Sequence, residues 1–297
     1  MTPKIPSYRK KNWMARSSGI ACSQHGATLI ELMVGITVGL LTIAVAMGAL
    51  MVSRGVSGTI SDASQLQQQA AYAFRVFGQQ FRQAGSIRLN LAANKNPGDT
   101  IDPADVVAFS PNPNITPVSG KSAPASGEYT ISVAYQNYSE ASFTSASEIS
   151  LFRDCLGEKK DPDIAVPATL MIPSQFVLNN TTSELVCAGA NNIPQAIIKN
   201  VADFQVRYLV QTEARVGTPK IRALDAAGVG ADWSGVFGVD VCLVLYGDES
   251  IDMPSGSSYK GCDNADIDIT TLAGPRKNRL HMLFRNVYQL RSQGLAG

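Results

Sequence analysis

The sequence predicts an α+β protein in which a long N-terminal helix packs on an antiparallel β-sheet. Three observations support this class: an unbroken apolar run near the N-terminus, an amphipathic helical pattern directly after it, and a remainder made mainly of short β-like segments. The 297 residues are enough for a cleaved leader, one membrane segment and one sizeable domain.

The N-terminal segment, residues 1–26, is basic. Setting its five cations aside leaves the rest of the chain at about −4, because the whole chain carries a formal charge of +1. A basic flank before an apolar run is typical of the cytoplasmic side of a membrane span. The acidic remainder argues against nucleic acid as a partner, since that function needs a basic face. The five cations are Lys4, Arg9, Lys10, Lys11 and Arg16.

The apolar run predicts a membrane-spanning and assembly helix over residues 27–53. Glu31 is the only ionisable side chain in this range, and Leu32–Val52 is entirely free of charge. As a helix, that stretch is about 32 Å long, which matches the hydrocarbon core of a bilayer. Arg54 ends the run on its far side.

Three ordinary alternatives compete for this segment. It can be a secretory signal peptide cleaved after Ala44-Val45-Ala46, a plain single-span anchor, or a buried core helix. None of these explains Glu31. A carboxylate inside an apolar helix costs a few kcal/mol, so Glu31 is predicted to be functional.

The segment from His25 to Met33, His-Gly-Ala-Thr-Leu-Ile-Glu-Leu-Met, resembles the class III signal of type IV pilins and type II secretion pseudopilins. The resemblance implies that a prepilin peptidase cleaves between Gly26 and Ala27 and methylates the new N-terminus. It also implies that Glu31, the fifth residue of the mature chain, is an assembly residue. The family usually has Phe at the position of Ala27.

Cleavage after Gly26 would leave a free α-amine close to the membrane interface. Glu31 of a neighbouring subunit is then expected to neutralise this amine in the dry core of a filament, where an unpaired charge is costly. Such a pair would set the axial register of the subunits, because a wrong offset would bury two unpaired charges.

Residues 54–86 predict an amphipathic helical half whose apolar stripe packs on the sheet, with Gly85 as its C-cap. Gly55 and Gly58 permit either one continuous helix or a hinge, after which Asp62 caps a restarted helix through the amide of Gln65. The stripe consists of Leu66, Ala70, Ala73, Phe74, Phe77 and Phe81.

Residues 87–297 predict a β-rich globular domain on the periplasmic or extracellular side. Residues 90–127 are rich in turn formers and predict a loop region with one short strand at 105–110. The unbroken apolar run at 239–246 predicts a central strand. Further strands are predicted at 128–137, 147–153, 199–210 and 279–291. In two of them the residues sharing one face are Ala202, Phe204, Val206, Tyr208 and Val210, and Leu280, Met282, Phe284, Tyr288 and Leu290.

A finer resemblance concerns the segment at 200–210, Asn-Val-Ala-Asp-Phe-Gln-Val-Arg-Tyr-Leu-Val, together with the strand at 236–246 and the closing strand. These segments and the chain length resemble PilW-type minor pilins. The resemblance implies a low-abundance subunit that primes assembly at the tip of a type IV pilus, a fimbrium used in cell adhesion. Its expected partners are the prepilin peptidase, other major and minor pilins, and the inner membrane before assembly. A GspJ-like pseudopilin of a type II secretion system is the alternative.

Four of the five cysteines lie downstream of the membrane segment, an even number that suits an oxidising compartment. Three pairings are possible. Cys155–Cys187 and Cys242–Cys262 are favoured because each closes a local loop, and each would contribute roughly 3–4 kcal/mol. Zinc is the competing explanation, but the sequence has no CxxC or Cys/His spacing.

No catalytic or cofactor motif is present, so we predict a protein that is not an enzyme and needs no cofactor; a membrane-tethered periplasmic hydrolase is the competing hypothesis. His281 is predicted to be a solvated strand residue. Asp263, Asp266 and Asp268 are weak calcium candidates without the glycine and glutamate of an EF-hand, and a solvated acidic loop is the alternative.

The processing signal gives the first testable prediction. Gly26→Val should leave the precursor uncut, because a bulky side chain replaces the glycine before the scissile bond. N-terminal sequencing of the unmodified mature protein should begin at Ala27. A mature N-terminus at Met47, directly after Ala44-Val45-Ala46, would instead identify an ordinary secreted protein.

Overall fold

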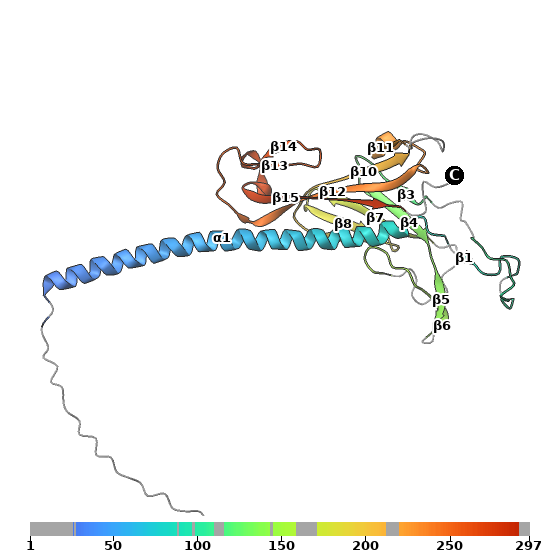
Figure 1. Cartoon of the computed structure of the whole chain (residues 1–297), viewed down its shortest axis with the longest axis horizontal. Coiled ribbons are helices and arrows are strands. Elements are labelled where there is room, and N and C mark those ends of the chain that lie inside the picture. The colour runs from blue at the N-terminus through green and yellow to red at the C-terminus, as the bar shows by residue number, and fades with distance from the viewer. Residues whose placement is uncertain are drawn as a thin grey trace, which may run out of the picture. The chain divides into compact units, whose positions relative to one another are not determined.

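The structure is a computed structural model that describes residues 26, 28–87, 89–96, 99–109, 116–142, 145–158, 171–211 and 220–290. The chain divides into two units, residues 1–53 and 54–297. Helix α1 (Leu29–Gln83) contributes to both, and each unit is described by itself (Figure 1). Within the described part of the chain, α1 is the one helix long and apolar enough to cross a membrane.

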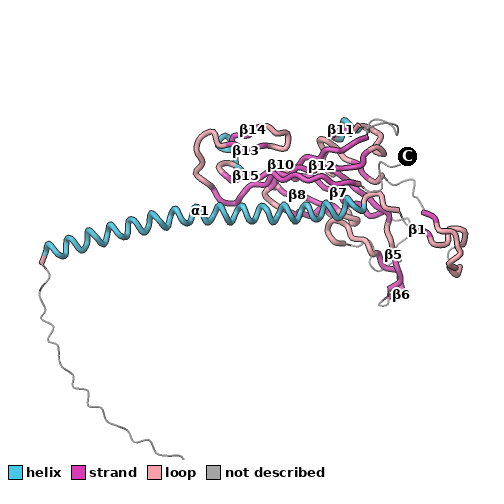
Figure 2. The backbone as a smooth tube through the Cα atoms, viewed as in Figure 1, coloured by secondary structure: helices cyan, strands magenta, loops and turns pink. Residues whose placement is uncertain are grey.

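Two antiparallel sheets form the larger unit (Figure 2). The first has the order β11 (Ile221–Leu224), β10 (Val201–Gln211), β12 (Val236–Ser250), β15 (Arg279–Gln289). The second has the order β3 (Val118–Ser119), β4 (Ile131–Gln136), β7 (Met171–Asn179), β8 (Glu184–Ala188), β9 (Pro194–Ile198).

Three two-stranded ribbons and three short helical turns complete the described elements. The ribbons are β1 (Leu89–Asn90) with β2 (Ala108–Phe109), β5 (Ser139–Ser142) with β6 (Ser145–Ser150), and β13 (Ser258–Lys260) with β14 (Asp266–Asp268). The turns are α2 (Ala226–Val229), η1 (Ile269–Thr271) and η2 (Gly274–Arg276). The fold class is therefore the predicted one, a long N-terminal helix packed on antiparallel sheets in an α+β domain.

The amphipathic stripe of α1 forms the centre of the hydrophobic core, as predicted. Phe77 is fully buried, and its ring contacts Phe176 of β7 at a centroid distance of 4.8 Å and Phe204 of β10 at 5.8 Å. Phe81 meets Phe176 and also Tyr288 of β15. The helix therefore joins the two sheets through one aromatic cluster.

The C-terminus of α1 is followed by Gly85, as predicted. Gly85 has φ +72°, a left-handed conformation that glycine adopts without strain and that is common after a helix C-terminus. Its amide donates to the carbonyl of Ala134 in β4 at 2.8 Å. The helix terminus is therefore attached directly to the second sheet.

The region from Gly55 to Asp62 is helical throughout, which agrees with the continuous-helix alternative. The predicted capping role of Asp62 is wrong, because this residue lies inside the helix. Its side chain is 4% exposed and accepts a hydrogen bond from the Glu249 amide at 2.9 Å. A Cβ atom at Gly247 would lie 2.2 Å from Asp62 Oδ2, so glycine is required there. A long-range backbone contact thus replaces the local cap.

The predicted central strand is confirmed, since β12 lies between β10 and β15 and is buried on both faces. One part of the β10 prediction is wrong. A register shift between Val201 and Asp203 turns Val201 into the main core, while Ala202 packs beside the Cys242–Cys262 pair on the opposite face. The remaining predicted residues of that face, and those of the closing strand, belong to or pack against the main core.

Strands β7, β8 and β9 were not predicted, and Pro173 in β7 is a strong signal against a central strand. Pro173 lies opposite Ala134, whose amide donates to Pro117 on the side away from β7. The ladder with β8 begins only at Gln175. The proline therefore occupies a position where neither neighbouring strand requires its missing N–H group.

Phe77→Ala should destabilise the globular unit by about 3–5 kcal/mol, because it removes a fully buried ring that contacts both sheets. Chemical denaturation of the purified full chain would measure the change. Tyr72→Ala, on an exposed part of the same helix, is the matched control and should change stability by less than about 1 kcal/mol. Equal effects of the two substitutions would show that Phe77 is not central to the core.

Candidate processing and assembly site

Helix α1 begins immediately after the predicted cleavage position. Thr28 acts as the N-cap: its Oγ1 accepts from the Glu31 amide at 3.3 Å, and its carbonyl accepts from the Leu32 amide at 3.1 Å. Glu31 lies in the first helical turn, where a negative charge is favoured by the helix dipole. The Thr-x-x-Glu spacing is the sequence signal of a capping box, and this N-cap was not predicted from the sequence.

The first unit leaves the side chains of this helix exposed. The exposed fraction is 75% for Leu29, 62% for Leu40 and 69% for Val52. The hydroxyls of Thr37 and Thr42 donate to the carbonyls of Val34 and Gly39 within the helix, so they do not need water. This surface therefore requires an apolar environment, which is consistent with a membrane anchor.

The structure describes two of the three predicted processing and assembly residues, Gly26 and Glu31. Gly26 is exposed, Ala27 lies outside the described residues, and Glu31 is exposed in α1. Among the described residues, none pairs with the Glu31 carboxylate. The helix therefore presents this carboxylate on its surface, where a second chain can reach it.

The predicted pairings of the four downstream cysteines are present. Cys155 is bonded to Cys187 with a Cα–Cα distance of 6.5 Å, and Cys242 to Cys262 with 5.7 Å. The first bond joins the loop after β6 to β8, and the second joins β12 to the loop between β13 and β14. Both connections attach irregular segments to the sheets.

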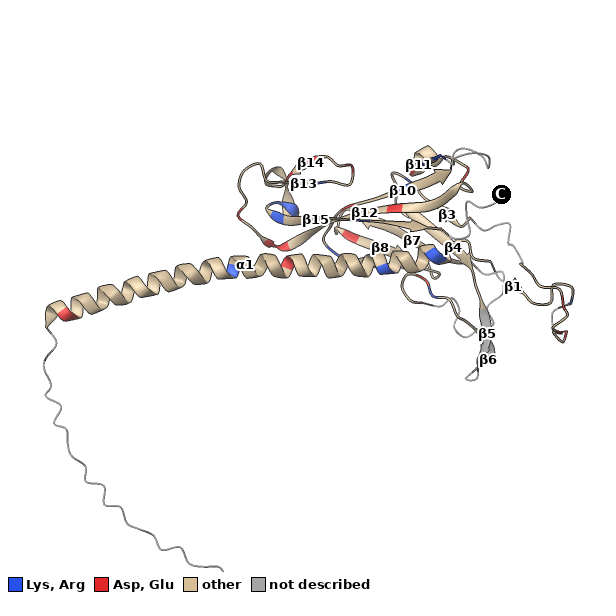
Figure 3. Cartoon of the chain, viewed as in Figure 1, with Lys and Arg blue, Asp and Glu red and all other residues tan. Residues whose placement is uncertain are grey.

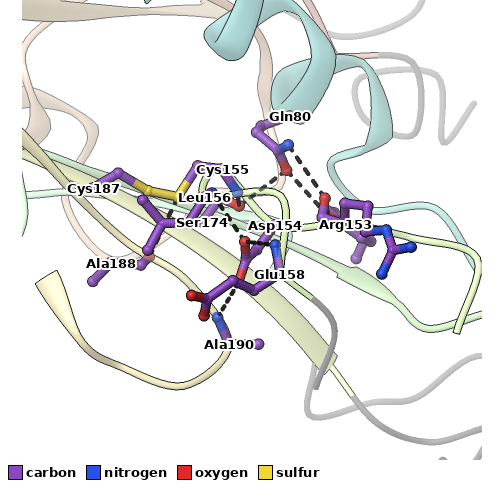
Figure 4. Close-up of a disulfide and its surroundings, with 11 residues drawn as sticks. Gln80, Arg153, Asp154, Cys155, Leu156, Glu158, Ser174, Cys187, Ala188 and Ala190 are labelled. Atoms are coloured by element: carbon purple, nitrogen blue, oxygen red, sulfur yellow. Dashed lines mark hydrogen bonds between the residues drawn. A yellow bond between two sulfur atoms is a disulfide. The ribbon is translucent and has the colours of Figure 1, made fainter. Parts of the chain in front are cut away.

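A polar network that was not predicted from the sequence surrounds the first disulfide (Figure 4). The Cys155 amide donates to Ser174 Oγ at 3.1 Å, and this hydroxyl donates to Oε1 of the buried Gln80 at 2.9 Å. Gln80 Nε2 donates in turn to the Arg153 carbonyl. The only signal available in the sequence was a polar residue at Gln80, beside the apolar stripe.

Asp154, in the same loop, is a buried carboxylate held by backbone amides. It is 2% exposed and accepts from the amides of Leu156, Glu158 and Ala190, each at 2.9 Å. A Cβ at Gly189 would lie 2.0 Å from Asp154 Oδ2, so glycine is required there. The arrangement fixes the loop and has no catalytic partner among the described residues in this network.

The prediction for His281 is wrong, because this side chain is 7% exposed. Its ring stacks on Tyr259 at 4.3 Å, and Nδ1 lies 2.9 Å from the Arg279 carbonyl, which makes Nδ1 the protonated nitrogen. Nε2 is buried without a hydrogen-bond partner. Burial is the main cause that lowers the pKa of His281. The hydrogen bond to the Arg279 carbonyl opposes this shift, and the positive charge of Arg276 adds to it.

The three weak calcium candidates do not form a site. Asp263 Oδ1 accepts from the Ala265 amide, Asp266 pairs with Lys260 at 2.7 Å, and Asp268 accepts from the amide and hydroxyl of Thr270. Each carboxylate therefore has its own local partner. Within the described residues, no group of three or more potential metal ligands is found.

Similarity to known proteins is found for this chain among solved structures. No protein-family model matches it, and no curated protein matches it. Among solved structures, it is similar to a type IV-like pilin from Thermus thermophilus, with 12% identity, a TM-score of 0.34, and coverage of 78% of this chain and 97% of the other.

Burial of His281 predicts a pH-dependent stability. Because its pKa is lower in the folded than in the unfolded chain, the unfolded chain binds more protons as the pH falls through about 6.5. The stabilisation should be complete above about pH 7.5, decline as the pH falls through 6.5, and level off below the folded-state pKa. Denaturation of the full chain between pH 5 and 8 would measure this dependence.

His281→Phe is the matched variant, because it keeps a ring against Tyr259 and removes the titrating group. The pH dependence should be weaker in this variant by the contribution of His281. Asp203, whose pKa is raised by burial, contributes in the opposite sense in both proteins and cancels in the difference. Identical pH profiles would contradict the prediction.

Proposed function

We propose that this chain is a minor pilin subunit of a type IV pilus that takes part in priming assembly at the tip. In this proposal a prepilin peptidase cleaves between Gly26 and Ala27. The mature chain then spans the inner membrane with its β-rich domain in the periplasm, and later enters the extracellular filament together with other pilins. Its role is structural and not enzymatic.

One observation carries the proposal. A single carboxylate, Glu31, lies on the first turn of a helix whose other side chains up to Ser53 are uncharged and exposed. An anchor needs the apolar surface but does not need the charge. A subunit that leaves the bilayer for a filament needs both, because the apolar surface is then covered by neighbouring helices and the charge selects their register.

The N-cap at Thr28 means that Glu31 has two possible roles, one in helix capping and one in pairing with a neighbouring subunit, and these have to be separated. A first-turn carboxylate contributes locally through the helix dipole, but glutamine at the same position also serves in a capping box. Glu31→Gln therefore preserves the cap and removes the charge. This substitution separates the local role from a pair with the α-amine of a neighbouring subunit.

Glu31→Gln should be cleaved and inserted normally, since Gly26 and the apolar run are unchanged. Its incorporation into sheared filaments should fall at least about tenfold, as expected when the α-amine of a neighbour is left buried without its partner. Immunoblots of membrane and filament fractions would measure both quantities.

Thr42→Val is the matched control: it removes a polar group that is already satisfied within the same helix, and it should assemble normally. Normal incorporation of Glu31→Gln would show that the carboxylate does not set register. Recovery of the unmodified chain in a secretion pseudopilus, and not in pili, would favour the GspJ-like alternative.

A further inference from the structure

A groove of about 520 Å³ lies between the second half of α1 and the edge strand β15. Arg75, Arg82 and Gln83 line it from the helix, and Asn286 and Tyr288 line it from the strand. All of these residues belong to the unit formed by residues 54–297. None of the lining residues belongs to the processing segment or to either disulfide.

The helical side of the groove carries two cations without a matching acid. Arg75 and Arg82 are exposed and seven residues apart, which places them on the same face about 10 Å apart along the axis. Among the described residues, neither forms a salt bridge. Helix α1 has no acidic residue after Asp62, so the pairing that usually balances charge on a helix surface is absent (Figure 3).

The floor of the groove is closely packed. Gly78 is buried there, and a Cβ at this position would lie 3.1 Å from the Tyr288 ring. The Tyr288 hydroxyl donates to the Phe74 carbonyl at 2.7 Å. Burial raises the pKa of Tyr288 to about 12, so the hydroxyl stays protonated and keeps this bond at physiological pH. The two arginines therefore extend from a surface that is already ordered.

We propose that this groove binds an acidic segment of a neighbouring subunit in the filament. Two carboxylates of that segment pair with Arg75 and Arg82. The inference rests on the proposed function and names the surface through which the β-rich domain contacts its neighbour.

Charge complementarity supports a protein partner of this kind. Arginine and carboxylate form short, bidentate, charge-assisted hydrogen bonds. This chain itself carries such an acidic segment, in which Asp248, Glu249 and Asp252 are all exposed. Asp248 already pairs with Lys199 at 3.5 Å, whereas Glu249 and Asp252 form no salt bridge among the described residues. Subunits of this type therefore have both the basic groove and the chemistry that it would receive.

Site-specific photo-crosslinking in the full chain tests the inference. A benzophenone amino acid replaces Gln79, which lines the groove and is exposed, and sheared filaments are irradiated and mapped by mass spectrometry. Cross-links should join position 79 to an Asp- or Glu-rich segment of another pilin. Combining Arg75→Glu with Arg82→Glu should lower the yield at least about tenfold, because two attractive contacts become repulsive.

Two further variants make the result specific. Arg222→Glu, an exposed change on β11, should leave the cross-link yield unchanged. Arg75→Lys with Arg82→Lys keeps the charge and should retain at least about half of the yield. Unchanged denaturation curves would confirm that all variants fold.

The outcomes separate this inference from the proposed function. Unmodified chain in filaments without cross-links at position 79, cross-links to a segment without acids, or an undiminished yield in the double Glu variant would overturn the groove proposal alone. Absence of the unmodified chain from filaments would overturn the proposed function, and the groove proposal with it.

Discussion

Burial of the aromatic stripe of α1 is the interaction on which the rest of the globular unit depends. Phe77 contacts β7 of one sheet and β10 of the other, and Phe81 extends the same cluster to β15. Neither sheet covers its own apolar face, so the helix supplies the third surface of a shared core. The strands in turn determine which side of the helix faces inward. The opposite side, with Arg75 and Arg82, is left exposed beside β15.

Buried polar groups attach this core to the irregular segments around it. Gln80 receives the Ser174 hydroxyl and donates to the Arg153 carbonyl, while Asp154 collects three amides from its own loop and from Ala190. Asp62 makes a similar contact with the end of β12. Each of these groups exchanges water for a specific long-range partner, a requirement that favours one loop conformation over its competitors.

The first half of α1, in contrast, is not buried within its own unit. Its apolar side chains have no core of their own within the described unit, and its one carboxylate lies on the first turn. A surface of this kind is stable only in lipid or against other helices, because water cannot solvate it favourably. The two parts of the helix therefore differ: Phe77 is buried within its own chain, whereas the apolar side chains of residues 29–52 are exposed and suit a membrane anchor.

Local sequence determined the apolar run, the amphipathic stripe with Gly85 after it and the central position of β12, because each depends on periodicity, charge or nearby spacing. It favoured the observed cysteine pairings among three possible ones, and the structure decided between them. Tertiary structure alone decided the positions that break those patterns. Pro173 is accepted in β7 since no neighbour needs its N–H, and Asp62 leaves its capping pattern for the Glu249 amide. His281 is buried by Tyr259, a residue that comes from a separate ribbon. These outcomes depend on which distant group packs against each residue. The periodicity of a single segment does not specify that group.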